Sequence, residues 1–404
     1  MLRIITMMKL QEICGFAALL CILVLSGGGV ALADEATSLA EAKALSTSTG
    51  KPILFEFYRS DCEYCERSEQ EAQSNQNIQY ALRSVIHYHC NVKDPDGVEL
   101  SEKYEVGYTY PVFLLTDATG EPITRWIGFN NAARLVTQIS DALKDQTTVA
   151  TREARLKTNP QLNDALKLAG YYADAMKYDQ AVASYETAQE IVGARGDYSY
   201  QIFYQTANAV WNEMLPFEAA TTSADAALAS SRVSLPNKIK VVELLARLAR
   251  KFDRTEVVGP YLQQGIDLTG GPQAQNLTEK HANFLADQAL HVDFDTTQAV
   301  MLKKTGLQPG WQNNPQECYG FARWCLEREI NLPEAESMCR RAAQAVPDQK
   351  AKAQVYGKLG EILAAQAKYG DAVDALLISV ENDPTRDLYH NQLKEYNDSL
   401  EARQ

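Results

Sequence analysis

A pair of cysteines separated by two residues, Cys62 and Cys65, constrains this chain more than any other sequence feature. The pair directly follows an apolar, strand-like run at 52–58 and begins a segment rich in Glu, Gln and Ala that is typical of a helix. A helix N-terminus carries partial positive charge and free N–H groups, which together stabilise a thiolate. The spacing therefore predicts that Cys62 is an exposed nucleophile and that Cys65, one turn later, can attack a mixed disulfide.

The first 33 residues have the pattern of a secretory signal peptide. Arg3 and Lys9 provide the positive start, an apolar stretch follows at 16–25, and a small-residue cleavage motif ends at Ala33. We therefore expect a periplasmic or otherwise exported protein that is cleaved after Ala33. The apolar stretch is short for a bilayer span, and an uncleaved anchor helix is the alternative.

Length, charge and cysteine content limit the class of protein. The chain has 404 residues, which predicts two or more domains, and a net charge of −13, which disfavours nucleic acid and anionic membranes as partners. Disulfides persist outside the cytoplasm, but the six cysteines that follow residue 33 are too few for a disulfide-stapled scaffold of this size. The Cys62–Cys65 pair is therefore interpreted as a chemically reactive pair rather than a structural cross-link.

Residues 35–145 alternate between helical and strand-like patterns. Helices are expected at 36–49, 66–84, 98–104 and 131–143, and strands at 52–58, 85–92, 111–116 and 122–127. The turn residues at 117–120 predict that the last two strands form a hairpin.

This order of elements resembles the thioredoxin fold, and two further positions carry the resemblance. Glu56 stands six residues before Cys62, where thioredoxins have a buried acid, and Tyr110 with Pro111 precedes a strand, as their cis-proline loop does. The resemblance covers residues 35–145, and this segment is similar to exported members of the family. It implies thiol–disulfide exchange without a cofactor or metal, with Cys62, Cys65, Glu56 and Pro111 as catalytic residues.

The resemblance also implies a substrate-binding loop. Backbone groups beside Pro111 would pair with an extended substrate, and we expect Tyr64, Thr109 and Tyr110 to contact it. One departure from the family pattern lies just before the first cysteine, where Ser60-Asp61 replaces the usual aromatic-containing approach. That departure puts the local environment of the nucleophile in doubt.

Glu56 lies within an apolar strand, and burial favours the neutral form of a carboxyl group. We therefore expect a raised pKa and a role in moving protons to or from Cys65. The alternative is a strand glutamate whose carboxyl group reaches water.

Charged neighbours predict the direction of the chemistry. Asp61, Glu63 and Glu66 surround the cysteine pair and outnumber Arg59 and Arg67. Negative neighbours disfavour a thiolate, and a less stabilised thiolate makes a less oxidising disulfide. We expect a reductant or isomerase-like protein rather than a strong oxidant.

Two other interpretations of the cysteine pair stay open. One is a purely structural disulfide. The other is a zinc site, which needs further ligands, and the local candidates are His87, His89 and Cys90. On a strand the two histidines share one face and Cys90 faces the other, so these three form a poor cluster.

From about residue 150 the chain is helical throughout, with self-similarity at a period in the mid-thirties that resembles tetratricopeptide (TPR) repeats. Repeats are expected at 150–235 and 316–404, with the clearest unit at 353–386, and 236–310 is an irregular repeat or a helical spacer. The predicted fold class is thus α/β plus all-α, a thioredoxin fold followed by a helical solenoid. Such arrays bind proteins, and the abundant tyrosines either serve that role or fill helix grooves.

Three later cysteines fall on the repeats. Cys318 and Cys325 share one face of a predicted helix, and Cys339 lies on its partner helix. A Cys325–Cys339 bridge is one interpretation, and simple burial is the other.

These patterns together predict an exported thiol–disulfide oxidoreductase whose TPR array holds a client protein. Its partners would be clients with disulfides and a membrane thiol reductase that supplies electrons. A chaperone-like or assembly scaffold, in which the thioredoxin domain only binds, is the alternative from another class. A metal-handling protein is a third interpretation.

Overall fold

The computed structural model describes residues 34–271 and 276–402. The chain divides into two compact units, the first ending at Ala154 and the second starting at Arg155. The predicted signal peptide, 1–33, lies outside the described residues. No helix in the two described ranges combines the length and the apolar character needed to cross a bilayer.

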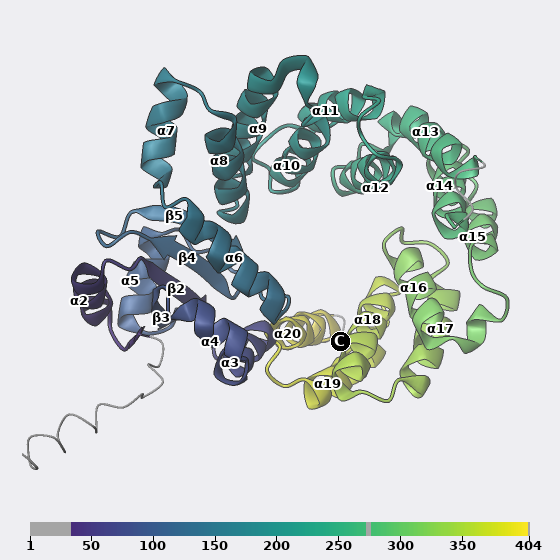
Figure 1. The fold of residues 1–404 in the computed structure, drawn as a ribbon. Helices are drawn as coiled ribbons and strands as arrows, with labels where there is room; N and C mark the ends of the chain where they lie inside the picture. Colours follow the sequence, from purple (N-terminus) through teal and green to yellow (C-terminus); the bar gives the residue numbers. More distant parts are fainter. Residues whose placement is uncertain (1–33, 272–275, 403–404) are drawn as a thin grey trace, which may run out of the picture. The chain divides into compact units, whose positions relative to one another are not determined.

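The first unit is built on a five-stranded sheet with the strand order β1-β3-β2-β4-β5 (Figure 1). Its strands are β1 (Asp34–Ala36), β2 (Ile53–Tyr58), β3 (Ile86–Asn91), β4 (Val112–Thr116) and β5 (Pro122–Ile127). Strands β1, β3 and β2 are parallel, whereas β4 is antiparallel to β2 and β5 to β4. Four strands match the predicted ranges to within one residue at each end, and the short β1 was not predicted. The central β2 leads directly to Cys62.

Helices of the first unit flank this sheet. They are α2 (Leu39–Thr49), α3 (Glu63–Ser74), α4 (Gln76–Leu82), α5 (Pro95–Lys103) and α6 (Ala132–Lys144), and α7 (Val149–Thr158) crosses into the second unit. One helix was predicted at 66–84, but Asn75 ends α3 and its side chain accepts hydrogen bonds from the N–H groups that start α4. The core on this face joins Leu54 and Phe113 of the sheet to Ile78 of α4 and Ile139 of α6.

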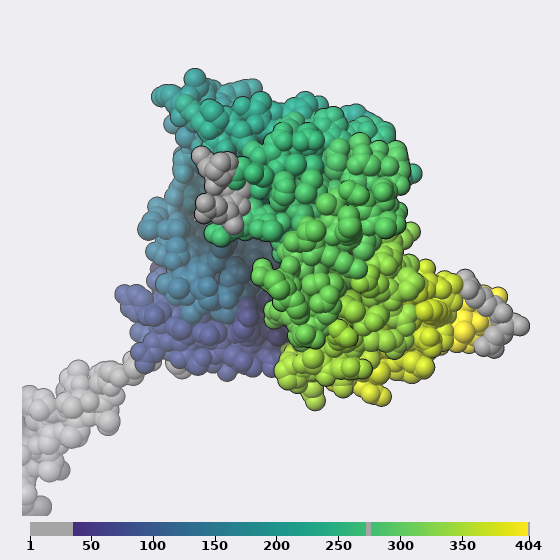
Figure 2. All heavy atoms as spheres, turned by 90° about the vertical axis from the view of Figure 1, so that its right-hand side faces the viewer, coloured from purple at the N-terminus to yellow at the C-terminus, as the bar shows by residue number. Residues whose placement is uncertain are grey.

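The second unit consists of helices that pack in sequential pairs. They are α8 (Leu162–Asp174), α9 (Tyr178–Val192), α10 (Ser199–Trp211), α11 (Phe217–Ala229), α12 (Leu235–Lys251), α13 (Gly259–Gly270), α14 (Thr278–His291), α15 (Thr296–Thr305), α16 (Pro315–Leu326), α17 (Leu332–Ala345), α18 (Gln349–Ala365), α19 (Tyr369–Asn382) and α20 (Asp387–Glu401). Each even-numbered helix packs against the next, from α8 with α9 to α18 with α19. In Figure 2 the part of this unit coloured from green to yellow presents one continuous surface. This arrangement confirms the predicted fold class.

A left-handed residue marks the turn inside each helix pair. These residues are Met176, Glu213, Asp253, Phe294, Glu329 and Ala367. In most of the turns the next residue donates its N–H to a carbonyl five residues earlier, as Lys368 does to Leu363 and Met214 to Ala209. The hydrogen bond closes the first helix of the pair and reverses the chain. Successive turn residues lie 37, 40, 41, 35 and 38 positions apart, so the spacing is longest across 236–310.

The repeat cysteines form no bridge. Cys318, Cys325 and Cys339 are free thiols with no exposed surface, so the interpretation of a Cys325–Cys339 disulfide is wrong. Burial raises the pKa of both Cys325 and Cys339 to about 12, which keeps the thiols protonated and unreactive. They are core residues of the helix pairs.

Candidate active site

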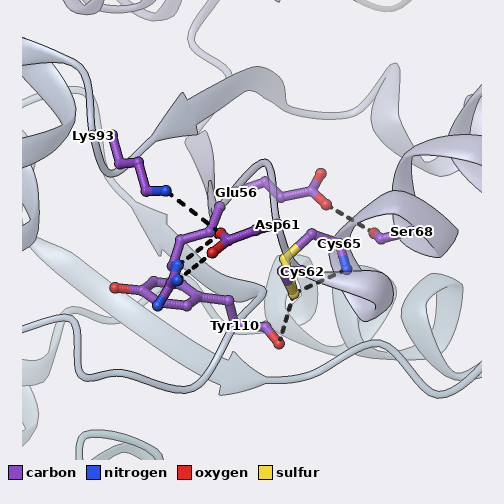
Figure 3. Close-up of a disulfide and its surroundings, with 8 residues drawn as sticks. Glu56, Asp61, Cys62, Cys65, Ser68, Lys93 and Tyr110 are labelled. Carbon is purple, nitrogen blue, oxygen red and sulfur yellow. Dashed lines mark hydrogen bonds and ion pairs between the residues drawn. A yellow bond between two sulfur atoms is a disulfide. The ribbon is translucent and has the colours of Figure 1, made fainter. Parts of the chain in front are cut away.

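Cys62 and Cys65 lie at the start of α3, directly after the loop that follows β2. Cys62 is the N-cap residue of the helix, and its Sγ accepts a hydrogen bond from the N–H of Cys65 at 3.3 Å. The two residues form a disulfide with their Cα atoms 5.2 Å apart (Figure 3). Cys62 is partly exposed, whereas Cys65 is buried. This is the arrangement that an attacking thiol and a sheltered resolving thiol require.

The loop before β4 faces this disulfide. The carbonyl oxygen of Tyr110 lies 3.6 Å from the Sγ of Cys62, and the peptide bond from Tyr110 to Pro111 is cis. Pro111 is buried, Tyr110 is half-buried, and Thr109 is exposed. The structure therefore brings the backbone of Tyr110, in the predicted loop, to the sulfur of Cys62.

Two tyrosines close in sequence to the site residues are exposed. Tyr64, between the two cysteines, is 55% exposed, and the guanidinium of Arg67 lies 5.1 Å from its ring centroid. Tyr108, two residues before Tyr110, is 94% exposed. Tyr108 was not predicted as a site residue, although its position beside the loop could have indicated it.

Glu56 is buried in β2 and holds two hydrogen-bond partners. Its Oε1 accepts a hydrogen bond from the hydroxyl of Ser68 at 2.8 Å, and its Oε2 lies 2.9 Å from Nε2 of His87 in β3. Ser68 is on α3, so the carboxylate ties the helix that carries the cysteines to two strands of the sheet. Neither Ser68 nor His87 was predicted as a partner of Glu56.

The prediction of a raised pKa for Glu56 is wrong. Burial alone would raise it, but the hydrogen bond and charge of His87, the charge of His89 and the hydrogen bond from Ser68 together lower the pKa. The carboxyl group is therefore ionised at neutral pH. A cavity of about 340 Å³ adjoins this pair and is lined by Glu56, His87 and His89 together with Glu69 and Arg83.

The surroundings of Asp61 differ from those expected from the charges in the sequence alone. Its Oδ1 accepts a hydrogen bond from Nε of Arg59 at 2.9 Å and lies 3.7 Å from Nζ of Lys93 (Figure 3). The hydrogen bond from Arg59 is the main reason that the pKa of Asp61 is lowered to about 2. Arg59 and Lys93 thus offset the negative charge of Asp61 next to Cys62. Of the three acidic neighbours counted in the sequence, Asp61 therefore disfavours a thiolate less than expected.

Two other ionisable residues of β3, His89 and Cys90, are shielded from solvent to different degrees. His89 stacks on Tyr58 with ring centroids 3.8 Å apart, and burial lowers its pKa. Cys90 is buried, and burial raises its pKa to about 12. Within 34–271 and 276–402, no group of three or more His, Cys, Asp or Glu side chains is arranged to hold a metal ion.

Comparison with known proteins identifies a domain in the first unit. A family model described as a thioredoxin-like domain matches residues 39–143. The search of curated proteins finds no match. Among solved structures, the solution structure of a thioredoxin from Thermus thermophilus is 25% identical and has a TM-score of 0.24, covering 26% of this chain and 83% of that chain.

Two TPR structures match a longer part of the chain. YrrB, described as a TPR protein with an unusual peptide-binding site, is 16% identical with a TM-score of 0.30, covering 61% of this chain and all of that chain. The TPR2AB domain of yeast Sti1, in a complex with pHSP90, is 13% identical with a TM-score of 0.23, covering 59% and 96%. Together with the paired helices, the family match shows that this protein has a thioredoxin-like domain at residues 39–143 and a helical-repeat region similar to TPR repeats after it.

Proposed function

We propose that this protein is an exported thiol–disulfide oxidoreductase that acts on disulfides of client proteins. The observation that carries the proposal is the Cys62–Cys65 disulfide at the N-terminus of α3, with the Tyr110 carbonyl 3.6 Å from the Cys62 sulfur. An accessible sulfur at a helix N-terminus, next to a loop with exposed aromatic residues, suits attack on an extended substrate.

The proposed reaction starts from the reduced protein. The Cys62 thiolate attacks one sulfur of a client disulfide, forms a mixed disulfide and releases the other client sulfur as a thiolate, which takes a proton from water. The Cys65 thiolate then attacks the sulfur of Cys62. The internal disulfide forms and the second client sulfur leaves, so the client gains two electrons and the protein loses two.

Two groups assist these steps in the proposal. Glu56, as an ionised carboxylate, accepts the proton of the Cys65 thiol, and its bond to His87 offers a route for that proton. Backbone groups of Thr109 and Tyr110 pair with the client, and Tyr64 packs against it. Pro111 keeps this loop next to the sulfur.

We propose further that the protein works outside the cytoplasm and that its repeat region holds the client. The cycle consumes two electrons per client disulfide, and a membrane thiol reductase is the donor that such a location implies. The charge of Glu63 and Glu66, both exposed in the first turn of α3, favours reduction or isomerisation over oxidation. Recovery of mature protein that begins at Asp34 would support export.

An insulin-reduction assay tests the proposal. The unaltered protein should reduce insulin with dithiothreitol as electron donor, and Cys62→Ser should fall to the background rate. A Cys65→Ser variant should instead accumulate mixed disulfides through Cys62, whereas a variant with both substitutions should trap none. If the unaltered protein shows no activity above background, the scaffold interpretation replaces catalysis.

A further inference from the structure

An exposed tryptophan in the second unit contacts two cations. Trp211, at the end of α10, is 36% exposed. The guanidinium of Arg247 lies 4.6 Å and Nζ of Lys251 lies 4.5 Å from its ring centroid. Both cations are on α12, four residues apart and so on one face of that helix. Helices α10 and α12 pack against each other, as Figure 1 also shows.

The two cations lack a carboxylate partner within the described ranges. Arg247 and Lys251 are exposed, and neither forms an ion pair, although Lys251 donates a hydrogen bond to the carbonyl of Trp211. Glu243, four residues before Arg247 on the same helix, pairs instead with Lys240 and Lys280, and Asp253, two residues after Lys251, is exposed. Cation–π contact replaces only part of the interaction that a carboxylate would give.

The surroundings add positive charge in a chain that is negative overall. Helix α12 carries five basic residues and one acidic residue, whereas the whole chain has a net charge of −13. Like charges repel one another, and an anionic ligand would relieve the repulsion. An anion is therefore the ligand that this surface favours.

Apolar surface lies beside these cations. Tyr204, seven residues before Trp211 and so on the same face of α10, is 39% exposed, and Met214 is 48% exposed. We define the α10–α12 surface as Tyr204, Trp211, Met214, Arg247 and Lys251. Exposed aromatic residues and arginine together are typical of protein-binding surfaces.

We propose that the α10–α12 surface binds an acidic peptide segment in which carboxylates alternate with aliphatic or aromatic side chains. The carboxylates pair with Arg247 and Lys251, and an apolar side chain packs against Tyr204, Met214 and the open edge of Trp211. This inference rests on the protein-binding part of the proposed function and specifies the chemistry of the client segment. It does not depend on the chemistry of Cys62.

A binding assay with a cysteine-free peptide tests the inference on the full chain. The probe is a fluorescein-labelled heptapeptide that alternates glutamate with leucine or phenylalanine, and fluorescence anisotropy measures the Kd. The double variant Arg247→Gln/Lys251→Gln should raise the Kd about tenfold or more, and Trp211→Leu should also weaken binding. Raising the salt from about 0.05 to about 0.5 M should weaken binding to the unaltered protein, because salt screens exposed charges.

Trp211 provides a second measurement. The other three tryptophans, Trp126, Trp311 and Trp324, are at most 6% exposed, so quenching by acrylamide reports mainly on Trp211. The acidic peptide should protect this fluorescence from quenching. A peptide with lysine in place of each glutamate should not.

The matched control is Lys352→Gln, which removes another cation that lies over an aromatic ring, 6.0 Å from the centroid of Tyr356. It should bind the acidic peptide as the unaltered protein does. Equal affinity for the acidic and basic peptides, unchanged affinity of the double variant, or tighter binding of a single-stranded oligonucleotide would each overturn the inference. The peptide has no cysteine, so the binding assay and the insulin-reduction assay give independent results. Failure to bind the peptide would leave the proposed redox activity standing, and failure to reduce insulin would leave the proposed peptide binding standing.

Discussion

At the residue scale, the candidate site depends on charges that are paired across elements. Glu56 is held by His87 from β3 and Ser68 from α3, and Asp61 is held by Arg59 and Lys93. The partners of Glu56 lower a pKa that burial alone would raise, and the partners of Asp61 offset its negative charge. The chemistry of the cysteine pair therefore depends on side chains that are distant in sequence.

Replacing Glu56 by Gln should destabilise the first unit by about 1–3 kcal/mol at neutral pH, because the buried side chains of Ser68 and His87 then lose a charged hydrogen-bond partner. Since the folded-state pKa of Glu56 lies below its ordinary value of 4.5, this stabilisation is present above that pH. It is lost as the pH falls through the folded-state pKa. Urea unfolding at several pH values measures the difference from the unaltered protein.

Two further variants act as controls for Glu56. Ser68→Ala removes one hydrogen bond to the carboxylate and should cost only about 1 kcal/mol. Replacing both Glu56 and His87 by leucine should destabilise less than Glu56→Gln alone, because fewer buried polar groups are then left without a good partner. Equal stability of Glu56→Gln and the unaltered protein at neutral pH would contradict the role assigned to the carboxylate of Glu56.

Asp61→Asn should lower the pKa of the Cys62 thiol by about half a unit, because it removes a negative charge and leaves the positive charges of Arg59 and Lys93. The rate at which iodoacetamide alkylates the reduced protein, followed against pH, measures that pKa. Asp141→Asn removes an aspartate that is paired with Lys144 on α6 and should leave the profile unchanged. A higher pKa of Cys62 in Asp61→Asn would show that this environment is misassigned.

At the element scale, the strands were predictable and the helix boundaries were less so. Strand ranges follow from continuous apolar runs bounded by turn residues, and these signals are local. The break at Asn75 was missed because one side-chain cap outweighs a helical pattern on both sides of it. The middle repeats looked irregular because the turn spacing there is 40 and 41 residues, longer than elsewhere in the array.

The non-glycine turns predict a stabilising substitution. Ala367 has φ 59° and is exposed between α18 and α19, where a residue with a Cβ atom is strained. Ala367→Gly should stabilise the repeat region by about 1 kcal/mol. Ala365→Gly, the same change at the last residue of α18, should destabilise by less than about 1 kcal/mol, because Ala365 already has helical backbone angles. Thermal unfolding compares the two, and a shift in the same direction for both would refute the left-handed assignment.

At the scale of the whole molecule, a buried aspartate connects three of the helix pairs. Asp287 of α14 accepts hydrogen bonds from Nε and a terminal nitrogen of Arg328, at 2.6 and 2.9 Å, and lies 3.3 Å from Arg250 of α12. Arg328 follows α16. In a repeat array, such links between neighbouring pairs carry the cooperativity of unfolding.

Asp287→Asn should destabilise the repeat region by about 3 kcal/mol, because two cations then face each other without a buried carboxylate. Burial raises the pKa of Asp287, but Arg328 and Arg250 outweigh it and lower the pKa. This stabilisation should therefore be lost as the pH falls below the ordinary value of 3.8. Urea unfolding followed by hydrogen exchange should show the helices before and after α14 unfolding at different urea concentrations, whereas a single unchanged transition would contradict this role.

The sequence by itself determined the cysteine pair, its position between strand and helix, the alternation of elements at 35–145 and the helical repeats after them. Each of these follows from local patterns, which short stretches of chain express independently of the rest. Tertiary contacts were needed to show that Glu56 is ionised, that Asp61 is paired with two cations, that the repeat cysteines are free, and that Trp211 contacts two cations. A pKa or a contact depends on groups that strand register and helix packing bring together, and in a single sequence those groups have no fixed separation.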